Sequence, residues 1–186
     1  LSIFKNGKKS IKNHRPNSSA VVIAAGPSVK KNNHLEMLSN SNYKGAIVCT
    51  DRMLILCLKN GITPKKFPKF YVLTIEPKDV TLKFYNDPIV KKYHKGIITV
   101  LSTCTEHETV EVIKKNNLEI FWFHPLIDDY RKPGSINRIM NLMSKSKSNP
   151  TGLPGLQTGG NVGCFSWIFS WVILGCSPIS LIGLDL

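Results

Sequence analysis

One stretch near the start of the chain, Ala20-Val21-Val22-Ile23-Ala24-Ala25-Gly26-Pro27-Ser28, has the pattern of a buried strand that ends in a tight turn. Its apolar run is rich in β-branched residues and stops where glycine and proline begin. Gly26 lets the backbone turn sharply and lets a ligand approach, because it has no Cβ. Pro27 stiffens the turn, and Ser28 offers a hydroxyl to a phosphate or to the next helix as a cap. The stretch therefore predicts the first strand of a sheet and a ligand-binding turn.

The rest of the chain repeats this strand pattern and alternates it with helical spacing. Further strands are predicted at residues 46–49, 70–75, 97–101, 120–123 and 179–182, and helices at 52–59, 107–115, 135–143 and 163–174. None of these strands alternates cleanly in polarity, so we expect both faces of the sheet to be covered. The last helix is nearly all apolar, which predicts a central buried position. Together the pattern indicates an α/β fold, a three-layer Rossmann-like domain with a mostly parallel sheet.

The composition limits the possible partners and the domain boundaries. With 25 Lys and Arg against 12 Asp and Glu, the net charge of +13 favours anionic partners such as phosphates, nucleotides, nucleic acid or an acidic membrane face. No recognised nucleic-acid module accompanies the charge, so we expect no nucleic acid as partner. The apolar stretch 162–174 is too short for a membrane span. Residues 1–18 have the composition of a basic tail or linker, and residues 19–186 form one domain that we expect to be truncated at its C-terminus.

Five cysteines are present, an odd number, and no two of them form a C-x-x-C pair. This pattern argues against a disulfide framework and against a zinc site. It is typical of small buried side chains in a reducing compartment, so we expect a cytoplasmic location and no metal ligands.

A second candidate for ligand binding opens the most apolar helix. The segment 157–163 contains Thr158, Gly159, Gly160 and Asn161 directly before that helix. Two glycines at a helix start expose backbone N–H groups and the positive end of the helix dipole. Thr158 and Asn161 add side-chain hydrogen bonds, so the segment predicts a cradle for a phosphate or a ribose.

Carboxylates follow three of the predicted strands. Asp51, Glu76 and Asp185 each stand at a strand's carboxyl end, and these ends share one edge of a parallel sheet. They are candidates to bind ribose hydroxyls, an acceptor or a metal, although an isolated acid at such a place also serves as a helix cap. His124 closes another strand at the same edge and is a weak candidate for a general base, as Asp185 is for a catalytic role.

Three segments together resemble the MptE-like domain family, which includes archaeal 6-hydroxymethylpterin diphosphokinases and Maf-type flagellin glycosyltransferases. They are the strand and G-P-S turn at 21–28, the strand ends around Asp51 and Glu76, and the glycine-rich start at 159–163 with the final strand at 181–186. The layout is also similar to bacterial sialyltransferases, which use CMP-sialic acid. This resemblance implies a nucleotide site lined by Gly26, Pro27, Ser28, Asp51, Thr158, Gly159, Gly160 and Asn161.

The resemblance leaves the reaction open. The diphosphokinase branch has an acid-rich segment after its third strand, which suits Mg²⁺ and ATP, whereas this chain has Ile75-Glu76-Pro77-Lys78-Asp79 there. This departure favours a glycosyltransferase with a nucleotide-activated sugar as donor, of the CMP-nonulosonic acid type, and a glycan or protein as acceptor. An ATP-dependent diphosphokinase with Mg²⁺ held by Glu76, Asp185 or both is the alternative. A nucleotide-binding module without catalysis is the alternative of another class.

Overall fold

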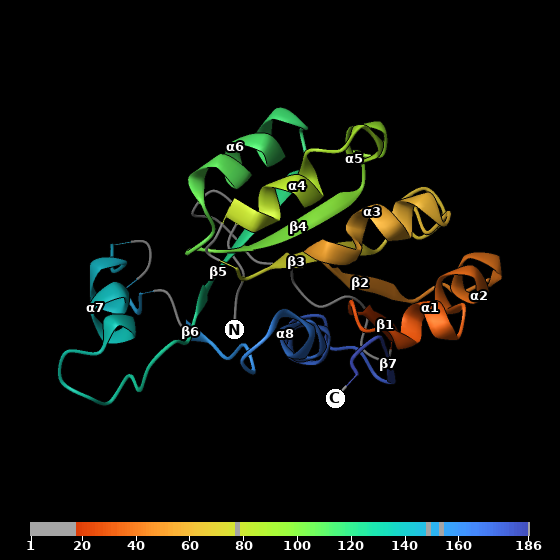
Figure 1. The fold of residues 1–186 in the computed structure, drawn as a ribbon. Helices are drawn as coiled ribbons and strands as arrows, with labels where there is room; N and C mark the ends of the chain where they lie inside the picture. Colours follow the sequence, from red (N-terminus) through yellow and green to blue (C-terminus); the bar gives the residue numbers. More distant parts are fainter. Residues whose placement is uncertain (1–17, 77–78, 148–149, 153–154, 186) are drawn as a thin grey trace.

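A seven-stranded parallel sheet organises the chain, as Figure 1 shows. The computed structural model describes residues 18–76, 79–147, 150–152 and 155–185. The strands are β1 (Ala20–Ile23), β2 (Ala46–Thr50), β3 (Phe70–Thr74), β4 (Ile97–Ser102), β5 (Glu119–Pro125), β6 (Gly155–Leu156) and β7 (Ile179–Ile182). Their order across the sheet is β6-β5-β4-β3-β2-β1-β7, and each neighbouring pair of these strands is parallel.

Helices cover both faces of this sheet and make the three layers. Those described are α1 (Ser28–Lys31), α2 (His34–Asn40), α3 (Asp51–Lys59), η1 (Asp79–Thr81), α4 (Leu82–Tyr85), α5 (Pro88–Lys92), α6 (His107–Lys115), α7 (Ile136–Met143), α8 (Val162–Ile168) and the π-helical η2 (Phe169–Ile173). One apolar core lies between the sheet and α1 to α6, and a second lies between the sheet and α8 with η2 (Figure 1). The predicted fold class, a three-layer α/β domain with a mostly parallel sheet, is confirmed.

Sequence spacing located the long elements and missed the short ones. The predicted strands overlap β1 to β5 and β7, and the helix predicted at 107–115 matches α6 in both bounds. The missed helices α1, α2, α4 and α5 have seven residues or fewer, too few to show an apolar periodicity. The missed strand β6 has two residues. The predicted tail at residues 1–18 lies, apart from Ser18, outside the described residues.

The expectation that the last helix is central and buried is wrong. In α8 and η2 only one side faces the sheet, where Phe165 and Phe169 are completely buried. The opposite side carries Trp167 and Trp171, which are 42% and 60% exposed. The reason is the layer arrangement, because one layer of helix covers this face of the sheet in the described part of the chain and its outer side meets solvent.

Candidate functional site

A pocket of about 520 Å³ opens at the carboxyl ends of the parallel strands. Its walls come from the segments that follow β1, β2, β3 and β7, from η1 and α4, and from the start of α8. The chain leaves β1 toward β2 on one side and places β7 on the other, so the pocket lies where the strand order reverses. Open α/β sheets bind their ligands at this kind of position.

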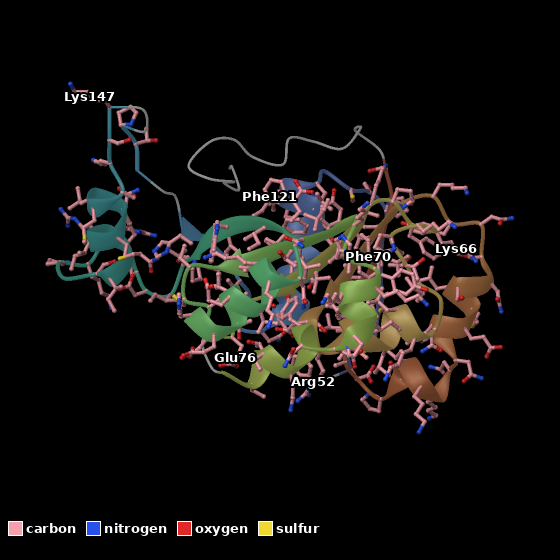
Figure 2. The ribbon with its side chains drawn as sticks, turned by 90° about the horizontal axis from the view of Figure 1, so that it is seen from above. Arg52, Lys66, Phe70, Glu76, Phe121 and Lys147 are labelled. Carbon is pink, nitrogen blue, oxygen red and sulfur yellow. The ribbon has the colours of Figure 1, made fainter. Side chains whose placement is uncertain are left out.

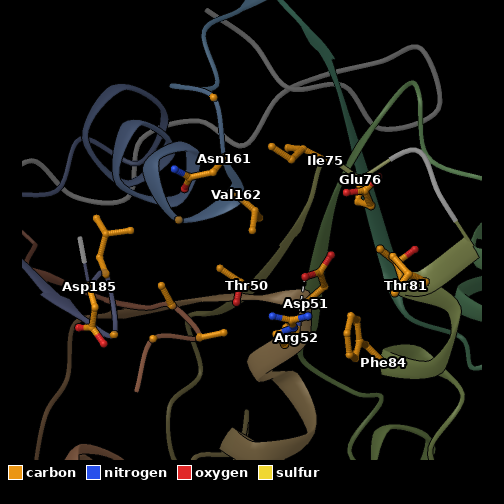
Figure 3. Close-up of a pocket in the computed structure, with 18 residues that line it drawn as sticks. Thr50, Asp51, Arg52, Ile75, Glu76, Thr81, Phe84, Asn161, Val162 and Asp185 are labelled. Atoms are coloured by element: carbon orange, nitrogen blue, oxygen red, sulfur yellow. Dashed lines mark hydrogen bonds between the residues drawn. The ribbon is translucent and has the colours of Figure 1, made fainter. Parts of the chain in front are cut away.

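The pocket brings together most of the residues singled out in the sequence. Gly26, Asp51, Glu76, Gly160, Asn161 and Asp185 all line it (Figure 3). Pro27 lines an adjoining pocket of about 430 Å³ on the other side of the turn. Ser28, Thr158, Gly159 and His124 are not among the residues that line the main pocket. The two glycine-containing turns therefore do share one rim, through Gly26 and Gly160.

Gly26 is required by the close approach of two strand ends. Its backbone N–H donates to the carbonyl oxygen of Gly183, with 2.8 Å between nitrogen and oxygen. A Cβ on Gly26 would lie 2.6 Å from that same oxygen and would also collide with the carboxylate of Asp185. The turn after β1 and the turn after β7 are thus packed backbone against backbone, and both glycines of this contact line the pocket.

Ser28 is already occupied by a side chain of the protein. The carboxylate of Asp185 accepts a hydrogen bond from the Ser28 amide at 2.8 Å and another from the Ser28 hydroxyl at 2.5 Å. These two bonds hold the pKa of Asp185 below its usual value. We expected the Ser28 hydroxyl to meet a ligand phosphate or to cap the next helix; instead an internal carboxylate takes the place of the anion.

Asp51 is a buried carboxyl group on the pocket wall. It is 5% exposed, and its Oδ1 accepts a hydrogen bond from the Arg52 amide at 2.7 Å. Burial raises its pKa to about 6, with the nearby Glu76 adding to the rise, while hydrogen bonds from Arg52 and Thr74 act in the opposite direction. A carboxyl group with this pKa can give up or accept a proton near neutral pH.

The start of α8 presents backbone amides to the same pocket. Asn161 caps the helix, because its Oδ1 accepts from the Cys164 amide at 2.9 Å. Gly159 and Gly160 precede it with φ values of +66° and +87°, which a side chain disfavours. The amides of Val162 and Gly163 belong to the first turn, which has no intrahelical acceptor for them, and both residues line the pocket.

His124 lies away from the pocket and is held inside the protein. Two backbone amides, those of Ile127 and Asp128, donate to Oδ1 of Asn137, which leaves the Asn137 Nδ2 to donate to His124 Nε2 at 3.1 Å. His124 Nδ1 then donates to the Thr103 hydroxyl oxygen at 2.9 Å. The imidazole is 6% exposed, and this burial lowers its pKa. These contacts give His124 a structural role.

Some of the residues that line the pocket were not among the candidates from the sequence, and three of them have polar or aromatic side chains that could contact a ligand. They are Arg52, Thr81 and Phe84 (Figure 3). Among the eighteen described residues that line the pocket, Arg52 is the only one with a cationic side chain. A cation in the first turn of a helix is unfavourable because it opposes the helix dipole, and this position could have identified Arg52 as a functional candidate from the sequence. Phe84 lies on a helix of four residues, which carries no such signal.

The carboxylates of the pocket do not form one cluster. Figure 3 shows Asp185 and Glu76 on opposite sides of the pocket, with Asp51 near Glu76. No group of three or more His, Cys, Asp or Glu side chains that could hold a metal is found within residues 18–76, 79–147, 150–152 and 155–185. Among the same residues, no helix has the length and apolarity that crossing a bilayer requires.

Comparison with known proteins agrees with this architecture. A Maf glycosyltransferase from Magnetospirillum magneticum AMB-1 has a similar fold, with a TM-score of 0.61 and 14% sequence identity. The similarity covers 95% of this chain and 24% of that one, so the chain spans about a quarter of its relative's length. No curated protein matches the sequence. The sequence profile described as 6-hydroxymethylpterin diphosphokinase MptE-like matches residues 2–186. The chain therefore belongs to the MptE-like family.

Proposed function

We propose that this chain is the nucleotide-binding domain of a transferase whose donor is a nucleotide-activated sugar of the CMP-nonulosonic acid type. One observation carries the proposal: a single pocket at the switch point of the sheet joins the turn after β1, the carboxylates after β2 and β3, and the start of α8. Membership of the MptE-like family and the fold of the Maf glycosyltransferase support a transferase. The acceptor is a glycan or a protein.

The phosphate of the donor would bind between Arg52 and the start of α8. The amides of Val162 and Gly163 and the positive end of the helix dipole favour an anion there, and α8 continues without a break into η2. Arg52 supplies the cation on the facing wall (Figure 3). Because Ser28 is taken by Asp185, the phosphate contacts are assigned to the second glycine-containing turn and not to the first.

Asp51 is the group best placed to take up a proton during transfer. In the proposed step the acceptor oxygen bonds to the anomeric carbon while its proton passes to the Asp51 carboxylate. The bond from that carbon to the phosphate oxygen breaks, and its electron pair stays on the departing nucleotide. Arg52 and the α8 amides stabilise this negative charge. A pKa of about 6 keeps Asp51 mostly ionised, and so able to accept the proton, at neutral pH.

A diphosphokinase remains the second candidate because of the family's name and because Asp51 and Glu76 lie close enough to raise the pKa of Asp51. Two carboxylates and the phosphates of ATP are a sufficient ligand set for Mg²⁺. In that case Asp51 and Glu76, not Glu76 and Asp185, would hold the ion. A nucleotide-binding module without catalysis is the third candidate.

Calorimetry separates these candidates. We expect CMP to bind without added Mg²⁺, and we expect Arg52→Ala to weaken that binding about tenfold because one charge-assisted contact to phosphate is lost. Lys59→Ala is the matched control, since Lys59 is an exposed cation at the far end of the same helix α3. The control should bind CMP as the unmodified chain does.

Other outcomes would overturn the assignment. Binding of ATP only in the presence of Mg²⁺ would favour the diphosphokinase. Nucleotide binding without release of CMP from a CMP-activated sugar, even with candidate acceptors present, would favour the non-catalytic module. No nucleotide binding below about millimolar concentration would end the proposal for this chain.

A further inference from the structure

Helix α7 has its polar side inward and its apolar side outward. Asn137 and Asn141 are its buried residues, at 2% and 9% exposure. The exposed apolar residues of the helix are Ile136, Ile139, Met140, Leu142 and Met143, with exposures from 40% to 76%. At 100° per residue these side chains cover an arc of about 160°. Helices of globular proteins normally show the opposite orientation, so this outward face is unusual for a helix of a folded domain.

The inward asparagines explain how the helix is held. Asn137 accepts from the amides of Ile127 and Asp128 and donates to the carbonyl oxygen of Pro125. The side chain of Asn141 donates to the carbonyl oxygen of Thr151. Backbone groups of the segments on both sides of α7 are thereby satisfied, which requires polar residues on this side. The apolar residues take the opposite side, where no described element covers them.

The apolar face belongs to a surface that projects from the domain. In Figures 1 and 2 the helix stands beyond the β5–β6 edge of the sheet, and Lys147 lies at the far tip of this unit. Ile127 and Tyr130 in the preceding loop add exposed apolar area, at 56% and 45%. Because the helix projects from the domain, its apolar face is accessible to a flat surface.

The charge around this face is predominantly positive, although Asp129 in the preceding loop lies 3.8 Å from the Arg131 side chain and offsets part of it. Residues 130–147 contain five Lys or Arg and no Asp or Glu. All five cations, Arg131, Lys132, Arg138, Lys145 and Lys147, are exposed. Asp128 before them is engaged at the start of α7, where it accepts from the Ser135 hydroxyl at 2.7 Å. A second copy of the chain would bring the same cations face to face, so the charge argues for an anionic partner.

We propose that α7 and its preceding loop dock on a membrane surface that contains anionic lipid. Apolar side chains on a projecting helix can enter the boundary between headgroups and acyl chains without a preformed groove. The flanking Lys and Arg remain at the level of the headgroups, where each attracts anionic lipid. This inference is independent of the proposed transferase reaction, because none of its residues lines the nucleotide pocket.

Flotation of the chain with lipid vesicles tests this. We expect the 186-residue chain to float with vesicles of phosphatidylcholine mixed with phosphatidylglycerol, and not with phosphatidylcholine alone. The double variant Ile139→Asn, Met143→Asn leaves the charge unchanged and should bind about tenfold more weakly, because two inserting side chains are lost. Met37→Asn is the matched control, since Met37 is also exposed, at 66%, but lies on α2.

A second pair of substitutions tests the charges separately. Arg138→Gln with Lys145→Gln should weaken binding by about fivefold for each cation removed and leave the thermal midpoint unchanged. If the Asn variants float as well as the unmodified chain does, attraction by the net charge alone explains the binding and the proposal fails. The proposal also fails if the chain does not float with the anionic vesicles. It fails likewise if the Asn substitutions instead abolish a protein complex that is detected by light scattering.

Discussion

The carboxylate of Asp185 accepts two hydrogen bonds from Ser28, one from its amide at 2.8 Å and one from its hydroxyl at 2.5 Å. The two residues lie 157 positions apart in the chain. They join the segment that follows the last strand, β7, to the helix that follows the first strand, and Asp185 lines the pocket at the carboxyl ends of the strands. The segment after the edge strand β7 thus supplies the carboxylate that binds the G-P-S turn.

Asp185→Asn is expected to lower the stability of the domain at neutral pH. The pKa of Asp185 is depressed by the Ser28 bonds, so its contribution is present at neutral pH and is lost as pH falls through the depressed value. The loss should therefore be visible in urea unfolding at pH 7 and disappear in acid. Glu36→Gln, an exposed carboxylate on α2, is the control. Equal midpoints for the two variants at pH 7 would contradict the prediction.

Asp51→Asn is expected to stabilise the protein at neutral pH and to abolish sugar transfer. Because the folded-state pKa of about 6 lies above the ordinary aspartate pKa of 3.8, the folded state holds this proton more tightly, and stability falls as pH rises from about 4 to 6. The asparagine variant has no such loss, so above pH 6 its free energy of unfolding should exceed that of the unmodified chain by about 3 kcal/mol. Unfolding curves between pH 4 and 8 measure the difference. If the asparagine variant is less stable than the unmodified chain at pH 7, the predicted direction of the stability change is wrong.

Gly26→Ala is expected to destabilise the fold by about 2–3 kcal/mol, because the new Cβ meets the carbonyl oxygen of Gly183 and that backbone cannot move aside. Gly160→Ala is the comparison. Its φ of +87° strains an alanine by about 1 kcal/mol, but no heavy atom lies within 4 Å of the added Cβ. Chemical denaturation measures the loss of unfolding free energy in each variant, and we expect the larger loss for Gly26→Ala. A cost at Gly26 no larger than the cost at Gly160 would contradict the prediction, because it would show that the contact between the two turns relaxes around the added Cβ.

His124→Gln is expected to loosen α7 without changing nucleotide binding. The substitution disturbs the contact to Thr103, at the end of β4, and the contact to Asn137, which links β5 to α7, but it touches no residue of the pocket. Hydrogen exchange should become faster in α7, while calorimetry with CMP should be unaffected. In the unmodified chain the lowered pKa of His124 makes its stability contribution fall as pH decreases below 6.5. If the variant loses transfer activity while hydrogen exchange in α7 is unchanged, His124 acts in catalysis and this prediction is wrong.

Much of the fold could be predicted because strands buried on both faces leave a continuous apolar run in the sequence. The run at 20–25 and the final strand were located from this signal alone. The short helices α1, α4 and α5 leave no such signal, since four or five residues do not complete a periodic pattern. For the same reason Phe84 and Thr81, which reach the pocket from α4 and η1, were missed.

Local chemistry determined the positions of the turns, the strand ends and their carboxylates, because a parallel sheet puts these ends on one edge whatever the details of packing. Only the tertiary structure decided which of these groups remain available. In the folded protein the amide and hydroxyl of Ser28 both donate hydrogen bonds to Asp185, and His124 is buried against Asn137. Asp51 remains on the pocket wall with a raised pKa. The tertiary structure also turns the apolar side of α7 outward. The physical reason is that periodicity identifies the two sides of a helix or strand, while hydrogen-bond satisfaction between distant segments selects which side faces inward.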